Sequence, residues 1–178
     1  TNNGSGVSGV AFNVQIMPLK VLAEEWDFIF GAVPFCCGAT DASVAAAIRY
    51  AEQFGADVIN MSLGGPDPSP VIDAAIKFAV SRGVFVAIAG GNSFTEGNPT
   101  TWPAAAAESI DGAMAVAAVD RFSQRAFYSN TGSYVEIAAP GGDQRVDGFD
   151  GIIQQTLDPD FALTFTLSPA QFREPRFD

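Results

Sequence analysis

The feature that most constrains the fold is an alternation of amphipathic helices and short apolar strands between residues 40 and 89. Apolar residues recur at helical spacing over 40–55 and over 69–83, and an apolar strand follows each of these segments, over 58–61 and 84–89. Each helical segment starts with a capping residue and ends at a glycine: Thr40 with Gly55, and Ser69 with Gly83. This order predicts βαβ units, and so an α/β fold: a doubly wound parallel sheet with helices on both faces.

Further elements are expected on both sides of this unit. Strands are predicted at 113–119, at 134–138 and at Val14–Leu22, where Pro18 indicates an edge or a bulge. Residues 23–39 have no period and are expected to form an irregular insertion, and the apolar run 84–89 is typical of a strand covered on both faces. We expect residues 1–178 to be a single partial domain in which 143–178 is loosely ordered. Within it, 149–178, which alternates over 161–167, should form a loose hairpin or an extended tail.

The composition disfavours two classes of protein, those that bind nucleic acids and those that span membranes. The net charge of −11 disfavours nucleic-acid binding, and no apolar run approaches the roughly 20 residues needed to span a bilayer. The start, TNNGSGVSGV, is not a signal peptide and contains no Met, which predicts an interior or processed piece of a longer protein. Cys36 and Cys37 are adjacent, which favours small hydrophobes or free thiols, and no His/Cys cluster exists for zinc.

Two glycine turns are the candidate site. Ser62, Leu63, Gly64 and Gly65 follow the first strand, and Gly90, Gly91 and Asn92 follow the second. In parallel sheets, ligands bind beyond the carboxyl ends of the strands, so both turns should face one crevice. Small residues in the first turn expose backbone groups to an extended peptide, and the Asn92 amide can donate to a developing oxyanion. Taken singly, each could also be an ordinary turn.

A third stretch, Gly4-Ser-Gly6-Val-Ser-Gly9, matches the dinucleotide fingerprint G-x-G-x-x-G. The fingerprint should follow a strand and open a helix, whereas this one opens the chain and precedes a predicted strand. A nucleotide-binding α/β domain is therefore kept only as an alternative. Loop carbonyls and an Asn side chain in the same stretch are suitable ligands for a hard cation.

Several segments together resemble the subtilisin-like serine proteases (subtilases, peptidase family S8). DVINMSLGG resembles the strand and substrate-binding segment of that family, and VFVAIAGGN resembles the strand that leads to its oxyanion-hole asparagine. NNGSGVSGVAFNVQIMPLKVL resembles its calcium loop and next strand, and AVAAVDRFSQRAFYSNTGSYVEIAAPG resembles its later strands. The resemblance runs in collinear order from Thr1 to Gly141.

The resemblance implies roles for individual residues. Asn92 would be the oxyanion donor, Ser62, Leu63 and Gly64 would pair with the substrate backbone, and Ala89, Gly90 and Gly91 would form one wall of the specificity pocket. A structural calcium ion would be held in part by Thr1, Asn3, Ser5 and Val7. Trp102–Pro103 matches a position at which the family has a cis peptide bond.

The resemblance also implies what this chain lacks. The family's catalytic Asp and His would precede Thr1, and its catalytic Ser would follow Asp178; the chain contains no histidine at all. We therefore expect the central segment of a secreted, extracellular serine endopeptidase that cleaves peptide or protein substrates, inactive as the isolated chain. A pseudoprotease that binds peptides without cleaving them remains an alternative.

Overall fold

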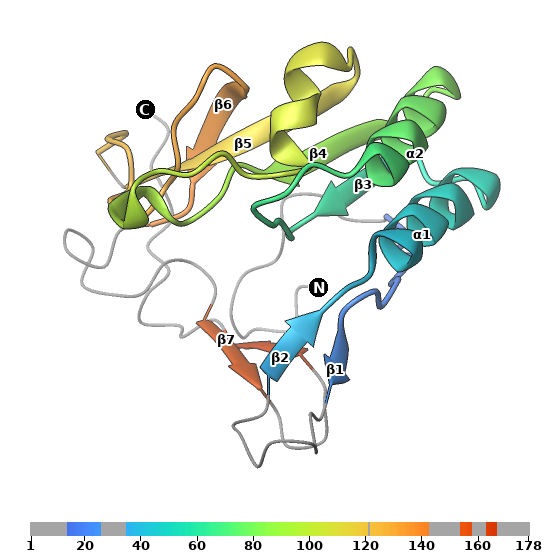
Figure 1. Ribbon diagram of the computed structural model, residues 1–178, viewed down its shortest axis with the longest axis horizontal. Helices are drawn as coiled ribbons and strands as arrows, with labels where there is room; N and C mark the ends of the chain where they lie inside the picture. Colours follow the sequence, from blue (N-terminus) through green and yellow to red (C-terminus); the bar gives the residue numbers. More distant parts are fainter. Residues whose placement is uncertain (1–13, 26–34, 121, 143–153, 158–162, 167–178) are drawn as a thin grey trace.

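The computed structural model describes residues 14–25, 35–120, 122–142, 154–157 and 163–166. Its centre is a four-stranded parallel sheet in the order β3-β4-β5-β6 (Figure 1). The strands are β3 (Val58–Met61), β4 (Phe85–Ala89), β5 (Ala113–Val119) and β6 (Val135–Pro140). The predicted parallel α/β organisation is confirmed, and β5 has the predicted bounds.

Helices α1 (Asp41–Gln53) and α2 (Pro70–Ser81) begin where the sequence predicts. The Thr40 hydroxyl accepts a hydrogen bond from the Ser43 amide at 3.1 Å, and the Ser69 hydroxyl accepts one from the Ile72 amide at 3.4 Å. Proline occupies the first position of α2, where its missing N–H costs nothing. After α1, Gly55 has φ of +82°, the left-handed conformation that favours glycine at a helix end.

One buried core joins the helices to the sheet. Ile76 of α2 and Val86 of β4 are completely buried, and the side chains of β4 alternate between buried and more exposed. The apolar run 84–89 predicts burial on both faces, but in the described residues the face of Phe85 and Ala89 stays partly exposed. Two short 3₁₀ helices complete this part of the chain: η1 (Phe94–Glu96) and η2 (Ala104–Ser109), the second packed against β5 and β6.

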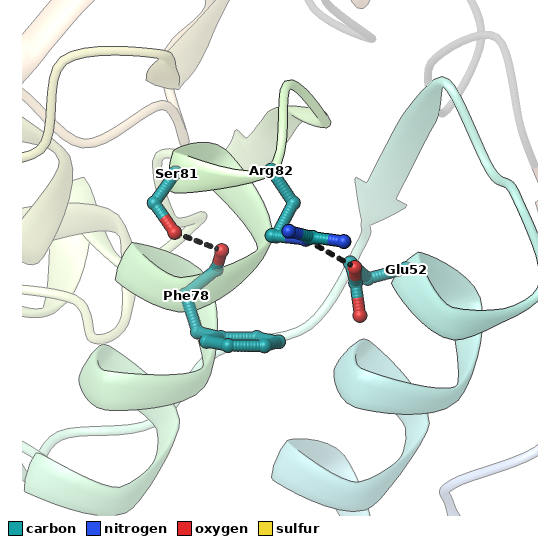
Figure 2. Close-up of polar contacts among 4 residues, drawn as sticks. All are labelled: Glu52, Phe78, Ser81 and Arg82. Atoms are coloured by element: carbon teal, nitrogen blue, oxygen red, sulfur yellow. Dashed lines mark hydrogen bonds and ion pairs between the residues drawn. The ribbon is translucent and has the colours of Figure 1, made fainter.

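One ion pair, between Arg82 and Glu52, connects the C-terminal ends of the two helices (Figure 2). The Arg82 Nε lies 3.1 Å from Glu52 Oε1, and the Arg49 guanidinium lies 5.1 Å from the ring centroid of Phe78. Because Arg82 is 64 % exposed, this ion pair is screened by water and contributes at most about 1 kcal/mol. The helices are therefore held mainly by their apolar stripes.

The N-terminal expectation was wrong in two places. Residues 14–22 form no strand, because no described strand pairs with them and Val14 and Ile16 are 60 % and 84 % exposed. The irregular segment expected over 23–39 instead begins and ends in strands, β1 (Ala23–Glu25) and β2 (Phe35–Gly38), which pair antiparallel. Cys36 and Cys37 therefore belong to a strand and not to a loop.

The C-terminal region agrees with the expected hairpin as far as it is described. Strands β7 (Gln154–Leu157) and β8 (Leu163–Thr166) pair antiparallel, with Gln154 opposite Thr166. Residues 143–153, 158–162 and 167–178 lie outside the described residues, so the predicted loose order of this region stays a prediction. None of the described helices is long and apolar enough to cross a bilayer.

Asp73, in the first turn of α2, has a carboxyl oxygen without a hydrogen-bond partner in the described part of the chain. Its Oδ1 is buried and makes no hydrogen bond within the described residues. Burial raises the pKa of the Asp73 carboxyl above its ordinary value of 3.8, and the nearby Lys77 ammonium offsets part of that rise. The folded state thus holds this proton more tightly than the unfolded state, so folding loses stability as the pH rises from about 4 through the raised pKa.

We expect Asp73→Asn to raise the melting temperature at pH 7, because the amide removes the cost of an ionised, poorly hydrated carboxylate. The gain should shrink towards pH 3, where the wild-type carboxyl is protonated. Thermal unfolding followed by circular dichroism between pH 3 and 8 measures both effects. Asp41→Asn is the matched control: this exposed first-turn residue of α1 interacts favourably with the helix dipole, so its loss should lower stability slightly. A fall in melting temperature for both variants at pH 7 would contradict the prediction.

Candidate functional site

The two predicted turns emerge from neighbouring strands at the same edge of the sheet. β3 and β4 pair in parallel with Met61 opposite Ile88. The next residues along the two chain segments, Ser62 and Ala89, therefore lie side by side. The expectation that both turns lie at adjacent carboxyl ends is confirmed (Figure 1). That the two turns face one crevice stays a prediction.

The first turn, 62–65, is fixed at its far end and open in its middle. Gly65 forms two backbone hydrogen bonds with Trp102, at 2.8 and 2.9 Å, which make an isolated antiparallel bridge. A Cβ on Gly64 would lie only 2.7 Å from the Thr101 Cγ2, so a side chain there would push against this bridge. Within the described residues, the backbone N–H and C=O groups of Leu63 and Gly64 form no hydrogen bond with other backbone groups. They are available to an added extended chain.

The second turn, 90–92, is held by its glycines. The Gly90 amide donates to the Val116 carbonyl at 2.8 Å, and its carbonyl accepts from the Tyr134 hydroxyl at 3.2 Å. Gly91 has φ of +110°, and a Cβ there would clash with Thr101 Oγ1. Only glycine satisfies both constraints. Asn92 follows, exposed, and its side-chain amide makes no hydrogen bond to another described residue.

Asn130 holds this second turn, and the sequence analysis did not identify it. The side chain is completely buried. Its Oδ1 accepts from the Ser93 amide at 2.6 Å, and its Nδ2 donates to the Pro99 carbonyl at 2.7 Å and to Thr101 Oγ1 at 3.0 Å. Its backbone amide donates to the Gly91 carbonyl at 3.0 Å. Asn130 thus bonds to the residues on both sides of Asn92. Its place in SNTG, shortly before the strand predicted at 134–138, is typical of any turn.

Thr101 and Trp102 connect the two turns. Thr101 accepts a hydrogen bond from Asn130, which holds the second turn, and the next residue, Trp102, is bridged to Gly65 in the first. The Trp102–Pro103 peptide bond is cis, as the resemblance implied. The two turns therefore belong to one hydrogen-bonded assembly.

A cavity of about 160 Å³ adjoins the first turn. Leu63, Gly64 and Gly65 contribute to its lining, together with apolar residues from the segment before β1 and from both helices. Two acidic residues, Asp41 and Asp67, also line it. None of the residues 89–92 does so, which places the cavity beside the first turn and away from Asn92.

Other predicted site residues cannot be placed. Thr1, Asn3, Ser5 and Val7, the expected calcium ligands, lie outside the described residues, as do the glycines of the dinucleotide pattern. The described part of the chain contains no group of three or more His, Cys, Asp or Glu residues suited to a metal. The chain has no histidine, so any base of that type would have to come from elsewhere.

Replacement of Asn130 should loosen the second turn. Asn130→Ala removes three side-chain hydrogen bonds from a completely buried position, so we expect a loss of about 2–4 kcal/mol in the free energy of unfolding. Urea denaturation measures this loss, and an unchanged m-value would show that the unfolding transition stays comparable.

The control is Asn98→Gly. Asn98 also makes three side-chain hydrogen bonds, all to Thr131, and glycine keeps its positive φ of +51°. Because these bonds are exposed, water can replace them and the loss should be smaller. Equal losses in the two variants would show that Asn130 has no special part in holding the turn.

The chain is similar to known proteins over most of its length. The subtilase family profile, Peptidase S8, matches residues 1–168. Subtilisin DY of Bacillus licheniformis is 37% identical over 142 residues, which is 79% of this chain and 46% of that protein. The Thermophilic serine proteinase of Bacillus sp. strain AK1 is 34% identical over 143 residues, 80% of this chain and 31% of that protein. The chain therefore spans less than half the length of these relatives.

Solved structures agree with this similarity. A protease from Pseudoalteromonas arctica superimposes with a TM-score of 0.52 at 37% sequence identity, over 63% of this chain and 35% of the other. This match shows that the parallel sheet and helices of this chain are part of the same α/β fold. From the family profile and these relatives we conclude that the chain belongs to the subtilase family of serine proteases.

Proposed function

We propose that this chain is the central segment of a subtilisin-like serine endopeptidase, and that it supplies the substrate cleft and the oxyanion donor. The observation that carries the proposal is the meeting of two different turns at one sheet edge. One offers unbonded backbone groups at Leu63 and Gly64, and the other offers the free amide of Asn92. A peptide bond held between them would lie within reach of a hydrogen-bond donor.

The two turns have separate tasks in this proposal. An extended substrate pairs through its backbone with Ser62, Leu63 and Gly64 and so lies across the carboxyl ends of β3 and β4. Ala89, Gly90 and Gly91 form a wall beside the residue that precedes the scissile bond. Asn92 Nδ2 then donates to the oxygen that becomes negative as the carbonyl carbon turns tetrahedral. Because the neighbouring backbone is fixed by Asn130, little reorganisation accompanies that change.

The nucleophile and base must come from outside this chain. Peptide hydrolysis by an activated Ser needs a His that takes the hydroxyl proton and an Asp that orients the imidazole. With no histidine, the isolated chain is expected to be inactive. The second candidate function is a pseudoprotease that binds peptides in this cleft without cleaving them; it applies if the full-length protein supplies no such Ser and His.

A serine-reactive fluorophosphonate probe distinguishes the two candidates in the full-length protein. Covalent labelling that heat denaturation abolishes would support an activated serine, as expected for the endopeptidase. Absence of labelling together with retained peptide binding would support the pseudoprotease. Absence of both would contradict the proposed cleft.

The role of Asn92 has its own test. In the full-length enzyme, Asn92→Ala should lower kcat with little change in KM, because the lost hydrogen bond forms in the transition state. The expected size, a fall of about 10²–10³-fold, is the known effect of removing this donor from a subtilisin. Steady-state kinetics on a peptide substrate measure it, and Ser93→Ala, a neighbouring side chain without a proposed role, is the control. A normal kcat in Asn92→Ala would remove Asn92 from the oxyanion role.

We also propose a structural calcium ion and an extracellular location, both on the resemblance to the family. The candidate ligands would bind the ion mostly through backbone oxygens, which suit a hard cation. They belong to Thr1, Asn3, Ser5 and Val7. If calcium binds the folded protein, its removal by a chelator should lower the melting temperature of the full-length protein. An unchanged melting temperature would count against the calcium site.

A further inference from the structure

We propose that the cavity beside Leu63–Gly65 binds a basic side chain, Lys or Arg, of the peptide substrate, and that Asp41 and Asp67 select for its positive charge. The inference rests on the proposed function, because it takes the first turn as the place where substrate lies. It adds a specificity that the turns alone do not give.

The shape and apolar lining of the cavity suit a long aliphatic stem. Its volume is about 160 Å³, and a cavity of roughly 150 Å³ is large enough to hold benzene. Apolar side chains come from three separate parts of the chain: Leu22, Val44 of α1 and Ile72 of α2. The methylene groups of Lys and Arg gain by covering such a surface while the charged end stays hydrated.

The charge of the cavity is uncompensated within the described residues. Asp41 comes from the first turn of α1 and Asp67 from the loop between β3 and α2, so two different elements bring carboxylates to one lining. Neither forms an ion pair with a described Lys or Arg, and no basic residue lines the cavity. Both aspartates are exposed, so they remain hydrated in the free protein and cost little before a ligand arrives.

Together these features match an amphipathic cation better than an apolar side chain. A Leu or Phe in the cavity would partly desolvate two carboxylates without pairing them, whereas Lys or Arg would place its charge beside them. The Ser69 hydroxyl, also in the lining, is occupied as the cap of α2 and adds no competing charge. The net charge of −11 further favours the approach of cationic peptides.

The cavity acts at a distance from the cleaved bond. Its lining includes three residues of the first turn and none of Ala89–Asn92. The basic residue is therefore one or more positions removed from the scissile bond, and the specificity should be visible as a positional preference in the substrate.

The test compares peptides that differ only in charge. Lys and norleucine have the same stem, so a library with each at successive positions isolates the ammonium group. In the full-length protein, we expect one position at which the Lys peptide has a kcat/KM on the order of tenfold higher than its norleucine partner. The ratio should fall in Asp41→Asn and in Asp67→Asn, and approach one in the double variant. High salt should lower it as well.

Asp57→Asn is the matched control, because Asp57 is exposed and lies outside the cavity lining. It should leave the Lys-to-norleucine ratio unchanged. A control variant that lowers the ratio as much as Asp41→Asn would reduce the effect to general charge and overturn the assignment to this cavity.

The remaining outcomes separate this inference from the proposed function. Cleavage with equal rates for both peptides at every position overturns the inference and leaves the endopeptidase intact. If no peptide is cleaved, fluorescence anisotropy of the same labelled pair measures binding instead. Tighter binding of the Lys peptide that both Asp variants abolish supports the inference in a non-cleaving protein, and equal or absent binding overturns it.

Discussion

The parallel pairing of β3 with β4 is the interaction on which the rest of the site depends. With Met61 opposite Ile88, the strands end at the same level and release their turns at one edge. A shift of register would move the turns apart along the strands and would turn buried side chains to the other face. Val86 and Ile88 are both fully buried and resist such a shift, because both belong to the core that includes Ile76 of α2.

A second set of contacts connects the two turns at this edge. Asn130 lies under the second turn, Thr101 lies between the turns, and Trp102 is bridged to the first. The glycines at 64 and 91 leave no room for side chains where these segments approach each other. The exposed groups, the backbone of Leu63 and Gly64 and the Asn92 amide, are thus carried by a support that centres on the completely buried Asn130.

The local sequence predicted the helices of this arrangement. It failed for strands whose formation depends on a pairing partner elsewhere in the chain. The caps Thr40 and Ser69 and the end glycines act within one helical turn, so α1 and α2 were found nearly to the residue. Residues 14–22 alternate like a strand but have no partner in the described residues, and a strand forms only when a second chain segment accepts its hydrogen bonds. The strands β1 and β2 were missed for the converse reason, because each is defined by the other and not by its own composition.

The sequence by itself determined the alternation of helices and parallel strands from α1 to β5, the ends of α1 and α2, and the two turns with Asn92. These features depend on propensities and hydrogen bonds over a few residues. Only the tertiary structure decided which residues support and surround them. The side chain of Asn130 reaches partners 29 to 37 residues away, and the cavity brings together Asp41 and Asp67 from opposite sides of β3 in the chain. Contacts at such separations depend on how the helices pack on the sheet, and no local pattern records them.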